Sequence, residues 1–319
     1  MEVPPAGPPL AITVSVEDRF FGLWQVELFA ERFRLLAPPP GTELVVMAST
    51  DAAACEEGIM SPYLAALAKA YPWAHFVLVP TRTGLVVEGH NFRVINKSAS
   101  RHYLLERHPR WREYDMCVID PDILPLPPFL DGYQGPPAGT VRSEHWRWIE
   151  PGPLREAVVC LAAEGCMAVE DPDEVVREIV ERYPLGYMFT LAAADAGPFC
   201  RRWEAWTERI VRGTTIGWMS DPYATVLAAY DLGLTVERVG YTMSSAWTGT
   251  TLKSSASILH YAWPNDFFYK KNHLEPGSGP FRAADYPEEA YPEGSIGRYM
   301  CACFNQHVRT RPASLAAYT

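Results

Sequence analysis

Short apolar runs alternate with segments of helical spacing along the first part of the chain. Residues 10–16 are apolar and β-branched and lie next to prolines, which predicts a buried strand. From residue 20 to 36, apolar side chains recur at mostly three- and four-residue intervals, and the prolines at 38–40 end the pattern, which predicts a helix. Residues 44–48 predict a second buried strand. The chain therefore opens with a β-α-β unit.

The same alternation continues to residue 120. Helical spacing returns at residues 62–70 and 91–106, and apolar runs at 75–79 and 116–119 predict strands, the second of which ends at Asp120. Strands that alternate with helices form mainly parallel sheets, which bind ligands at the carboxyl ends of their strands. We therefore expect an α/β fold with a mainly parallel central sheet flanked by helices, and Asp120 at its ligand-binding edge.

The second part of the chain is less regular. Residues 124–139 are rich in proline and glycine and residues 141–148 are aromatic and charged, which predicts loops near a binding site. The remaining pattern predicts helices at 173–182, 196–211 and 222–232 and strands at 236–241 and 257–261. We expect one domain over residues 10–275, with halves at 10–123 and 124–275, between a flexible N-terminus (1–9) and a C-terminal extension (276–319).

Composition narrows the classes of function. With 319 residues, 48% of them hydrophobic, the chain can bury a large core. Its net charge of −10 argues against sequence-independent attraction to nucleic acid. No apolar stretch reaches the roughly 18 residues that span a bilayer, and residues 1–9 lack the basic start of a signal peptide. We expect no nucleic-acid partner, no transmembrane segment and a cytoplasmic protein, with the secretory lumen as the alternative only if an anchor has been removed.

The seven cysteines are an odd number at uneven spacing, which predicts reduced thiols and not a complete disulfide framework. Cys301 and Cys303 form a C-x-C pair. Zinc sites usually draw four ligands from two such pairs, and the sequence offers no second one. We therefore do not expect zinc there.

Asp120 and Asp122 are separated by one residue at the end of a predicted buried strand. Two carboxylates this close repel each other unless a cation lies beside them. Hard oxygen ligands favour magnesium, manganese or calcium. A solvated Asp-Pro-Asp turn is the commoner explanation of a D-x-D sequence, but the strand before it and the Pro-Leu-Pro-Pro after it favour a metal site.

His260 stands far downstream, again at a predicted strand end, and Lys270 and Lys271 follow it. A neutral imidazole can complete an oxygen-rich metal shell, and lysine ammonium groups can neutralise phosphate charge. A single histidine is more often a structural hydrogen-bonding group. The two lysines nearby favour a site for a metal-bound phosphate compound.

Asp221 lies directly before Pro222, where a helix is predicted to begin. Aspartate followed by proline is typical of a helix N-cap, and this structural role is as well supported by the spacing as a functional one. The functional alternative is an acid that takes a proton or stabilises developing positive charge.

Six short segments, in this order, resemble one enzyme family. They are Thr13-Val14-Ser15-Val16, Trp24-Gln25, Asn96-Lys97, residues 114–129 around Asp120 and Asp122, Gly217-Trp218 with Asp221 and Tyr223, and Leu259-His260-Tyr261. The set is similar to the plant-type peptidyl hydroxyproline arabinosyltransferases and peptidyl serine galactosyltransferases, which have the GT-A fold. The chain departs from the family pattern at Ser98, where the family has proline, at Asp221, where it has glutamate, and in lacking the anchor of a Golgi enzyme.

The resemblance implies roles for individual residues. It implies that Asp120, Asp122 and His260 bind the metal. Asp221 is the implied catalytic residue. The resemblance also implies that nucleotide-sugar binding involves Thr13, Val14, Ser15, Asn96, Lys97, Asp120 and Gly186. Lys270 and Lys271 join this set because of their charge and their position after His260. Trp146, Trp148 and Trp247 are candidates for stacking on sugar rings, although aromatic side chains more often belong to a core.

We therefore expect a metal-dependent GT-A glycosyltransferase that uses Mn²⁺ or Mg²⁺ and a UDP-sugar donor. The resemblance implies a hydroxyl acceptor, such as serine or hydroxyproline of a peptide or another glycan. One alternative is a nucleotidyltransferase, although residues 15–22 are not the glycine-rich phosphate loop it requires. The other is a carbohydrate- or partner-binding protein that keeps the fold without catalysis.

Overall fold

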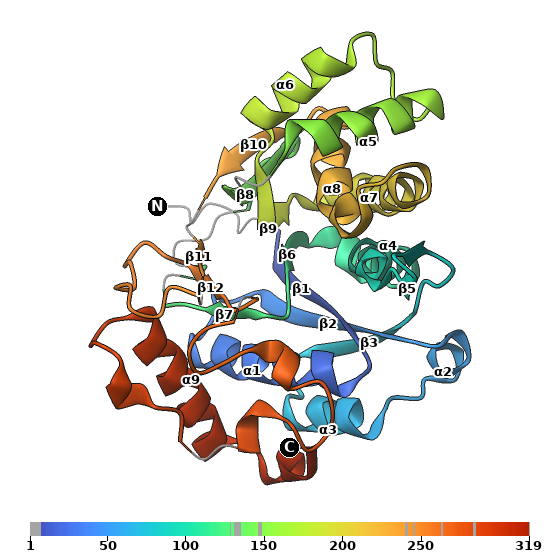
Figure 1. The fold of residues 1–319 in the computed structure, drawn as a ribbon. Helices are drawn as coiled ribbons and strands as arrows, with labels where there is room; N and C mark the ends of the chain where they lie inside the picture. The colour runs from blue at the N-terminus through green and yellow to red at the C-terminus, as the bar shows by residue number, and fades with distance from the viewer. Residues whose placement is uncertain are drawn as a thin grey trace, which may run out of the picture. The chain divides into compact units, whose positions relative to one another are not determined.

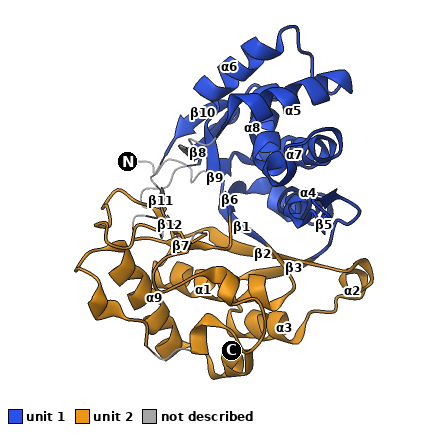
Figure 2. Ribbon diagram, in the orientation of Figure 1, with its two compact units in different colours: residues 1–15, 79–119, 134–239 blue, residues 16–78, 120–133, 240–319 orange. Residues whose placement is uncertain are grey.

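A computed structural model describes residues 8–127, 129–130, 135–145, 149–239, 242–244, 246–262, 264–282 and 285–318. The chain divides into two compact units (Figure 2). Unit 1 comprises residues 1–15, 79–119 and 134–239, and unit 2 comprises residues 16–78, 120–133 and 240–319. The units therefore alternate along the sequence. The assignment of nucleotide binding to residues 10–123 and of sugar and acceptor binding to residues 124–275 stays a prediction.

Seven strands form the main sheet in the order β10-β8-β9-β6-β1-β2-β3. Their bounds in that order are Thr235–Arg238, Thr140–His145, Leu185–Leu191, Asp115–Ile119, Leu10–Glu17, Thr42–Thr50 and His75–Pro80. β10 pairs in parallel with β8, and β6 with β1, whereas β9 pairs antiparallel with both β8 and β6. Among the five strands from β10 to β1, β9 alone is reversed. The prediction of a mainly parallel sheet is confirmed.

Unit 1 contains five α-helices among its described residues. Figure 1 labels each of them. They are α4 (Asn96–Arg107), α5 (Pro151–Ala163), α6 (Pro172–Arg182), α7 (Ala193–Gly213) and α8 (Ser220–Asp231). α7 buries Phe199, Trp203 and Trp206 at three- and four-residue spacing and packs against α4, α5 and α8. A short hairpin of β4 (Val86–Val87) and β5 (His90–Asn91) and three 3₁₀ turns complete the unit: η1 (Arg93–Ile95), η2 (Pro109–Glu113) and η3 (Gly217–Met219).

Unit 2 contains α1 (Phe20–Leu35), α2 (Ala52–Glu57), α3 (Pro62–Ala70) and α9 (Ile296–Thr310). A three-stranded sheet in the order β11 (Thr242–Ser244), β12 (Ile258–His260) and β7 (Ile123–Pro125) lies in the same unit. α1 contacts β7, α3 and α9. Four 3₁₀ turns follow in the last part of the chain: η4 (Lys270–Asn272), η5 (Pro280–Arg282), η6 (Glu288–Ala290) and η7 (Ala313–Tyr318).

Aromatic rings form much of the core of unit 2. Tyr261 is fully buried and stacks on Trp24 with the ring centroids 6.2 Å apart. Phe268 lies 6.0 Å from each of these rings and 4.8 Å from Phe304 on α9. Because Tyr261 follows β12 and Phe268 precedes η4, this cluster fixes the chain on both sides of the loop between them.

A buried ionic network ties the end of the chain to α1. Glu27 on α1 accepts hydrogen bonds from His307 Nε2 at 2.6 Å, Arg311 Nε at 2.5 Å and Tyr63 Oη at 2.5 Å. Burial alone would raise the pKa of Glu27, but His307 and Arg311 outweigh burial and hold it below its ordinary value. The C-terminal extension predicted for residues 276–319 thus contains an ordered helix, α9, that belongs to the core of unit 2.

Several parts of the secondary structure differ from the sequence prediction, among them α9, which was not predicted. Residues 140–145, predicted as the start of a loop, form β8, and α5 was not predicted because its first turn contains Pro151, Gly152 and Pro153. Proline is tolerated in the first helical turn, where its missing N–H has no helical partner. The helix predicted from residue 91 begins at Asn96, since β5 and η1 precede it.

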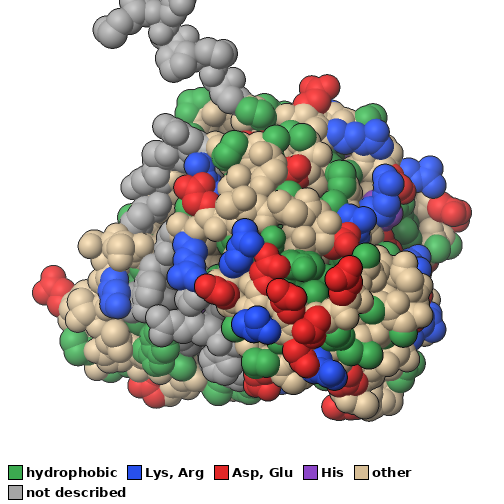
Figure 3. Space-filling model, turned by 90° about the horizontal axis from the view of Figure 1, so that it is seen from above, with side chains coloured by type: hydrophobic (Ala, Val, Ile, Leu, Met, Phe, Trp, Pro, Cys, Tyr) green, Lys and Arg blue, Asp and Glu red, His purple; other side chains and the backbone are tan. Residues whose placement is uncertain are grey.

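All seven cysteines are free, and Cys301 and Cys303 are buried on α9. Among the described residues, no helix has the length and the apolar composition needed to cross a bilayer. The face drawn in Figure 3 shows acidic and basic side chains interspersed.

Candidate functional site

Strand pairing within unit 2 brings His260 to the two aspartates. β12 pairs antiparallel with β7, and the register places His260 opposite Ile123. Asp122 directly precedes Ile123, and Asp120 directly follows β6. The ladder between β7 and β12 therefore places the histidine beside the Asp-Pro-Asp turn, although about 140 residues separate them in the sequence.

The side chains of Asp120, Asp122 and His260 form a compact group of ligand atoms. One carboxylate oxygen of each aspartate and one imidazole nitrogen all lie within 4.8 Å of one another. Asp122 is buried, Asp120 is 9% exposed, and His260 is partly buried. Two carboxylates and one imidazole match the hard, mainly oxygen ligand set that Mn²⁺ and Mg²⁺ prefer, so the residues present fit such a cation.

Tyr261 holds the backbone of the Asp-Pro-Asp turn. Its backbone N–H donates a hydrogen bond of 3.0 Å to the carbonyl of Asp122, and its hydroxyl donates one of 3.2 Å to the carbonyl of Pro121. In the sequence, Tyr261 is notable only as part of the Leu-His-Tyr resemblance. Its contacts depend on the β7–β12 pairing, which no sequence spacing reveals.

The side chains of His260 and Lys270 face the carboxylate of Asp122. Nε2 of His260 lies 3.3 Å from Oδ1, and Nζ of Lys270 is hydrogen-bonded to Oδ2. Burial alone would raise the pKa of Asp122, but His260 and Lys270 outweigh burial and hold it well below the ordinary value. Burial favours the neutral imidazole, but Asp122 outweighs it and raises the pKa of His260. The negative charge at Asp122 is thus strongly stabilised.

Lys270 and Lys271 are placed differently. Both belong to η4, but the side chain of Lys270 is only 17% exposed and contacts Asp122, whereas Lys271 is exposed. The structure therefore brings Lys270 to the group of Asp120, Asp122 and His260.

The residues predicted to line the nucleotide pocket meet in unit 1 around α4. The hydroxyl of Ser15 donates to the carbonyl of Asn96 at 3.0 Å. The guanidinium of Arg101 donates to the hydroxyl and carbonyl of Thr13 at 3.0 and 2.7 Å and to the carbonyl of Lys97 at 2.6 Å. Val14 is fully buried in β1. Thr13, Ser15, Asn96 and Lys97 thus lie together, and their role in nucleotide binding stays a prediction.

Arg101 was not predicted from the sequence. It is 1% exposed, and the ring of Trp203 lies 5.8 Å from its guanidinium carbon. A buried arginine is uncommon because the loss of hydration is costly. Here the guanidinium bonds to the carbonyl of Thr13 in the middle of β1 and to that of Ile119 at the end of β6.

Gly186 lies in β9 beside β8. Its N–H donates to the hydroxyl of Ser143 at 2.9 Å, and a Cβ atom at this position would lie within 2.9 Å of Cδ of Glu144. The position is therefore too close to its neighbour for any other residue without a shift. Its predicted place next to the donor sugar is not tested by these contacts.

Asp221 lies in the first turn of α8, one residue inside the helix, which begins at Ser220 after Met219 as the N-cap. The N-cap explanation of Asp221 is therefore wrong. The residue is 1% exposed, and its carbonyl accepts hydrogen bonds from Trp203 and Thr225. An acid in the first helical turn is stabilised by the helix dipole.

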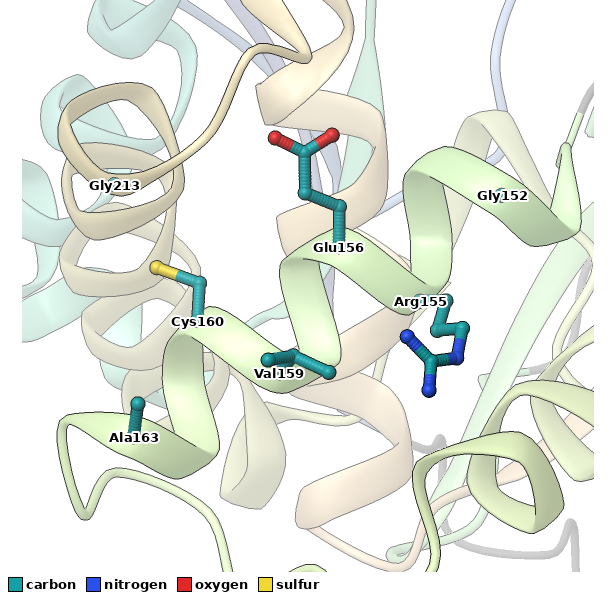
Figure 4. Close-up of a pocket in the computed structure, with 7 residues that line it drawn as sticks. All are labelled: Gly152, Arg155, Glu156, Val159, Cys160, Ala163 and Gly213. Carbon is teal, nitrogen blue, oxygen red and sulfur yellow. The ribbon is translucent and has the colours of Figure 1, made fainter.

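Two cavities open beside α5 in unit 1. One, of about 350 Å³, lies between α5 and the end of α7, and Figure 4 shows Glu156 and Cys160 on α5 near Gly213. The other, of about 390 Å³, is lined by Glu156 and also by Met219 and Tyr223, which lie two residues on either side of Asp221. Of the tryptophans considered for sugar stacking, Trp247 is 50% exposed, and Trp146 and Trp148 lie outside the described residues.

No protein-family model matches the chain, and no curated protein matches it in sequence.

Solved structures with a similar fold are sugar-transferring enzymes. The galactosyltransferase LgtC in complex with donor and acceptor sugar analogues aligns with a TM-score of 0.55 at 11% identity, over 97% of this chain and 100% of that chain. An active-site mutant of LgtC aligns with a TM-score of 0.52 at 10% identity and the same coverage. At such low identity the similarity establishes the fold alone. The chain has the α/β fold of GT-A glycosyltransferases, as predicted.

Proposed function

We propose that this protein is a metal-dependent glycosyltransferase that moves a sugar from a nucleotide-sugar, preferably a UDP-sugar, to a hydroxyl acceptor. The observation that carries the proposal is the meeting of Asp120, Asp122 and His260, whose ligand atoms lie within 4.8 Å of one another. The fold supports it, because ligands of α/β folds bind at the carboxyl ends of the strands and Asp120 follows β6 there.

Asp120, Asp122 and His260 would hold Mn²⁺ or Mg²⁺. When bound, such a cation supplies Lewis-acid stabilisation of the diphosphate leaving group. The pairing of β7 with β12 and the two hydrogen bonds of Tyr261 keep the three ligands in place before any substrate arrives. Because the ligands are already in position, little free energy is needed to rearrange them when the metal and the substrate bind.

Further residues have proposed roles. Lys270 and Lys271 would stabilise negative charge on the departing nucleoside diphosphate. Asp221 would take the proton of the acceptor hydroxyl or stabilise positive charge on the sugar ring. The segments at Thr13–Ser15 and Asn96–Lys97, joined by Arg101, would bind the nucleotide, and Gly186 would border the donor sugar.

The donor class is tested by thermal unfolding with UDP-, GDP- and CMP-sugars, each with and without Mn²⁺. A ligand that binds only the folded protein raises the midpoint of unfolding. We expect an increase with UDP-sugars and Mn²⁺ together, and its loss after addition of EDTA. Equal shifts with all three nucleotides, or none in any combination, would contradict the proposal.

Turnover is tested by the release of UDP from UDP-sugars without an acceptor. Asp122→Asn is expected to lower the rate by about two orders of magnitude, as for other charge-stabilising groups. Asp173→Asn is the matched control, because the side chain of Asp173 on α6 is 66% exposed. Equal rates in the two variants would exclude catalysis at this site.

A second candidate is a carbohydrate-binding protein of the same fold without catalysis. The ion pair between Lys270 and Asp122 favours it, because an ammonium group can neutralise this carboxylate without a metal ion. Sugar binding that is unchanged by EDTA, without release of UDP, would support this candidate.

A further inference from the structure

Lys270 occupies one face of a carboxylate that is also a proposed metal ligand. Its ammonium group is hydrogen-bonded to Oδ2 of Asp122, and His260 approaches Oδ1 at 3.3 Å. Both side chains of the ion pair are largely enclosed, 17% exposed for Lys270 and 8% for Asp122. An enclosed ion pair is screened weakly by solvent, so a second cation at the same carboxylate meets strong repulsion from the ammonium group.

The backbone is anchored on both sides of Lys270. Two residues before it, the ring of Phe268 is buried against Trp24 and Phe304. Three residues after it, the carbonyl of His273 accepts a hydrogen bond of 3.0 Å from the indole N–H of Trp24. The start and the end of the segment are therefore fixed, and the ammonium group can leave Asp122 by rotation of its own side chain.

We propose that Lys270 is the counter-cation of Asp122 in the metal-free protein. A divalent cation must displace its ammonium group in order to bind. The diphosphate of the nucleotide then gives the displaced ammonium group a new anionic partner. This inference rests on the proposed function. Metal and diphosphate then bind cooperatively. The diphosphate pairs with the ammonium group that the metal displaces, and the metal pairs with the carboxylate that the ammonium group leaves. The metal site is weak until the nucleotide arrives.

Lys271 provides the matched comparison. It is the next residue in the same 3₁₀ turn and carries the same charge, but its side chain is exposed. Removing either lysine removes one positive charge near the site. The charge of Lys271 acts on the site more weakly, because solvent screens an exposed group more strongly. A difference between the two lysine variants therefore reports on the contact with Asp122.

The first test measures binding of Mn²⁺ alone, without nucleotide, from the paramagnetic resonance signal of free Mn²⁺. We expect Lys270→Met to bind Mn²⁺ about tenfold more tightly than the wild type, and Lys271→Met to remain within about twofold. Lys270→Arg keeps the charge and is expected to bind as weakly as the wild type. Equal Mn²⁺ affinity in the wild type and in Lys270→Met would overturn the inference but would still support the metal site. Binding in neither protein would overturn the inference, and the absence of Mn²⁺ binding in the presence of UDP as well would overturn the metal site.

The second test repeats the titration in the presence of UDP. Mn²⁺ affinity of the wild type is expected to rise with UDP by about tenfold more than that of Lys270→Met. The same rise in both proteins would show that the ammonium group is not transferred to the diphosphate. Thermal unfolding checks that each variant is folded, and Lys270→Gln replaces Lys270→Met if the latter does not fold.

Discussion

The carbonyl of Asp122 accepts a hydrogen bond of 3.0 Å from the backbone N–H of Tyr261, next to the imidazole of His260. The hydroxyl of the same tyrosine bonds to the carbonyl of Pro121. Two residues that are adjacent in sequence thus have different roles at this site. His260 offers a ligand atom, and Tyr261 holds the turn that carries the other two ligands.

Tyr261→Phe removes the hydroxyl and keeps the buried ring. We expect a loss of about 1 kcal/mol in unfolding free energy, the usual value of one hydrogen bond, and a several-fold weaker affinity for Mn²⁺. Tyr286→Phe is the control, because the Tyr286 hydroxyl donates to the carbonyl of Pro280 at 2.8 Å in the same unit. A similar loss of Mn²⁺ affinity in both variants would mean that Tyr261 acts on stability alone.

Metal binding is expected to depend on pH through His260. Only the neutral imidazole binds a metal ion, and the nearby Asp122 raises the pKa of His260 above its ordinary value of 6.5 despite burial, which acts in the opposite direction. Protons therefore compete with the metal up to a pH above 6.5, and Mn²⁺ affinity rises with pH through this range. Calorimetry between pH 6 and pH 8 checks this, and a flat profile would exclude His260 as a ligand.

Arg311→Met is expected to destabilise the protein by roughly 3 kcal/mol, because it leaves Glu27 buried with fewer cationic partners. Arg298→Met is the control, since Arg298 pairs with the exposed Glu289 and should contribute less than about 1 kcal/mol. Urea unfolding measures both. Equal effects would show that the buried network does not hold the C-terminal helix.

The buried network around Glu27 predicts that the stability of the protein depends on pH in the acid range. The pKa of Glu27 is held below its ordinary value of 4.5, so its contribution to stability is present above that pH and is lost as the pH falls through the lowered pKa. Wild-type stability should therefore fall more steeply below pH 4.5 than that of Glu27→Gln. Parallel curves for the two proteins would contradict this assignment.

Gly186→Ala tests the close approach of β9 to Glu144. A Cβ atom there must displace the Glu144 side chain, so we expect a loss of about 1–3 kcal/mol and weaker nucleotide-sugar binding. Gly152→Ala in α5 is the control, because its Cβ would meet open space, and we expect a smaller loss of stability and no effect on nucleotide-sugar binding. Urea unfolding and thermal shifts with UDP-sugars measure the two effects. An unchanged shift in Gly186→Ala would remove this residue from the donor site.

The sequence contains enough information for four strands of the main sheet and for the group of Asp120, Asp122 and His260. β1, β2 and β6 are buried apolar runs and β3 is a partly buried one, and the hydrophobic pattern locates all four to within a few residues. Asp120, Asp122 and His260 are recognised because each stands at a strand end. Their meeting could be expected from the resemblance, but its geometric cause, the antiparallel pairing of β7 with β12, involves strands of only three residues.

Other features depend on tertiary contacts that leave no local pattern. α5 begins in a Pro-Gly-Pro sequence, and α9 follows a proline- and glycine-rich stretch, so both are hidden by their surroundings in the sequence. Lys270 was expected to face phosphate, and nothing in the sequence indicates that it contacts Asp122. Arg101 lies on a helix with no local sign that it is buried.

The proposed function depends above all on Asp120, Asp122 and His260 holding one divalent cation together. The most direct test is a Mn²⁺ titration of the wild type and of Asp120→Asn, Asp122→Asn and His260→Ala in the presence of UDP, followed by the paramagnetic resonance signal of free Mn²⁺. The account predicts one site in the wild type and a loss of at least about tenfold in affinity in each variant. Affinity that is unchanged in all three variants, or no Mn²⁺ binding by the wild type, would contradict it.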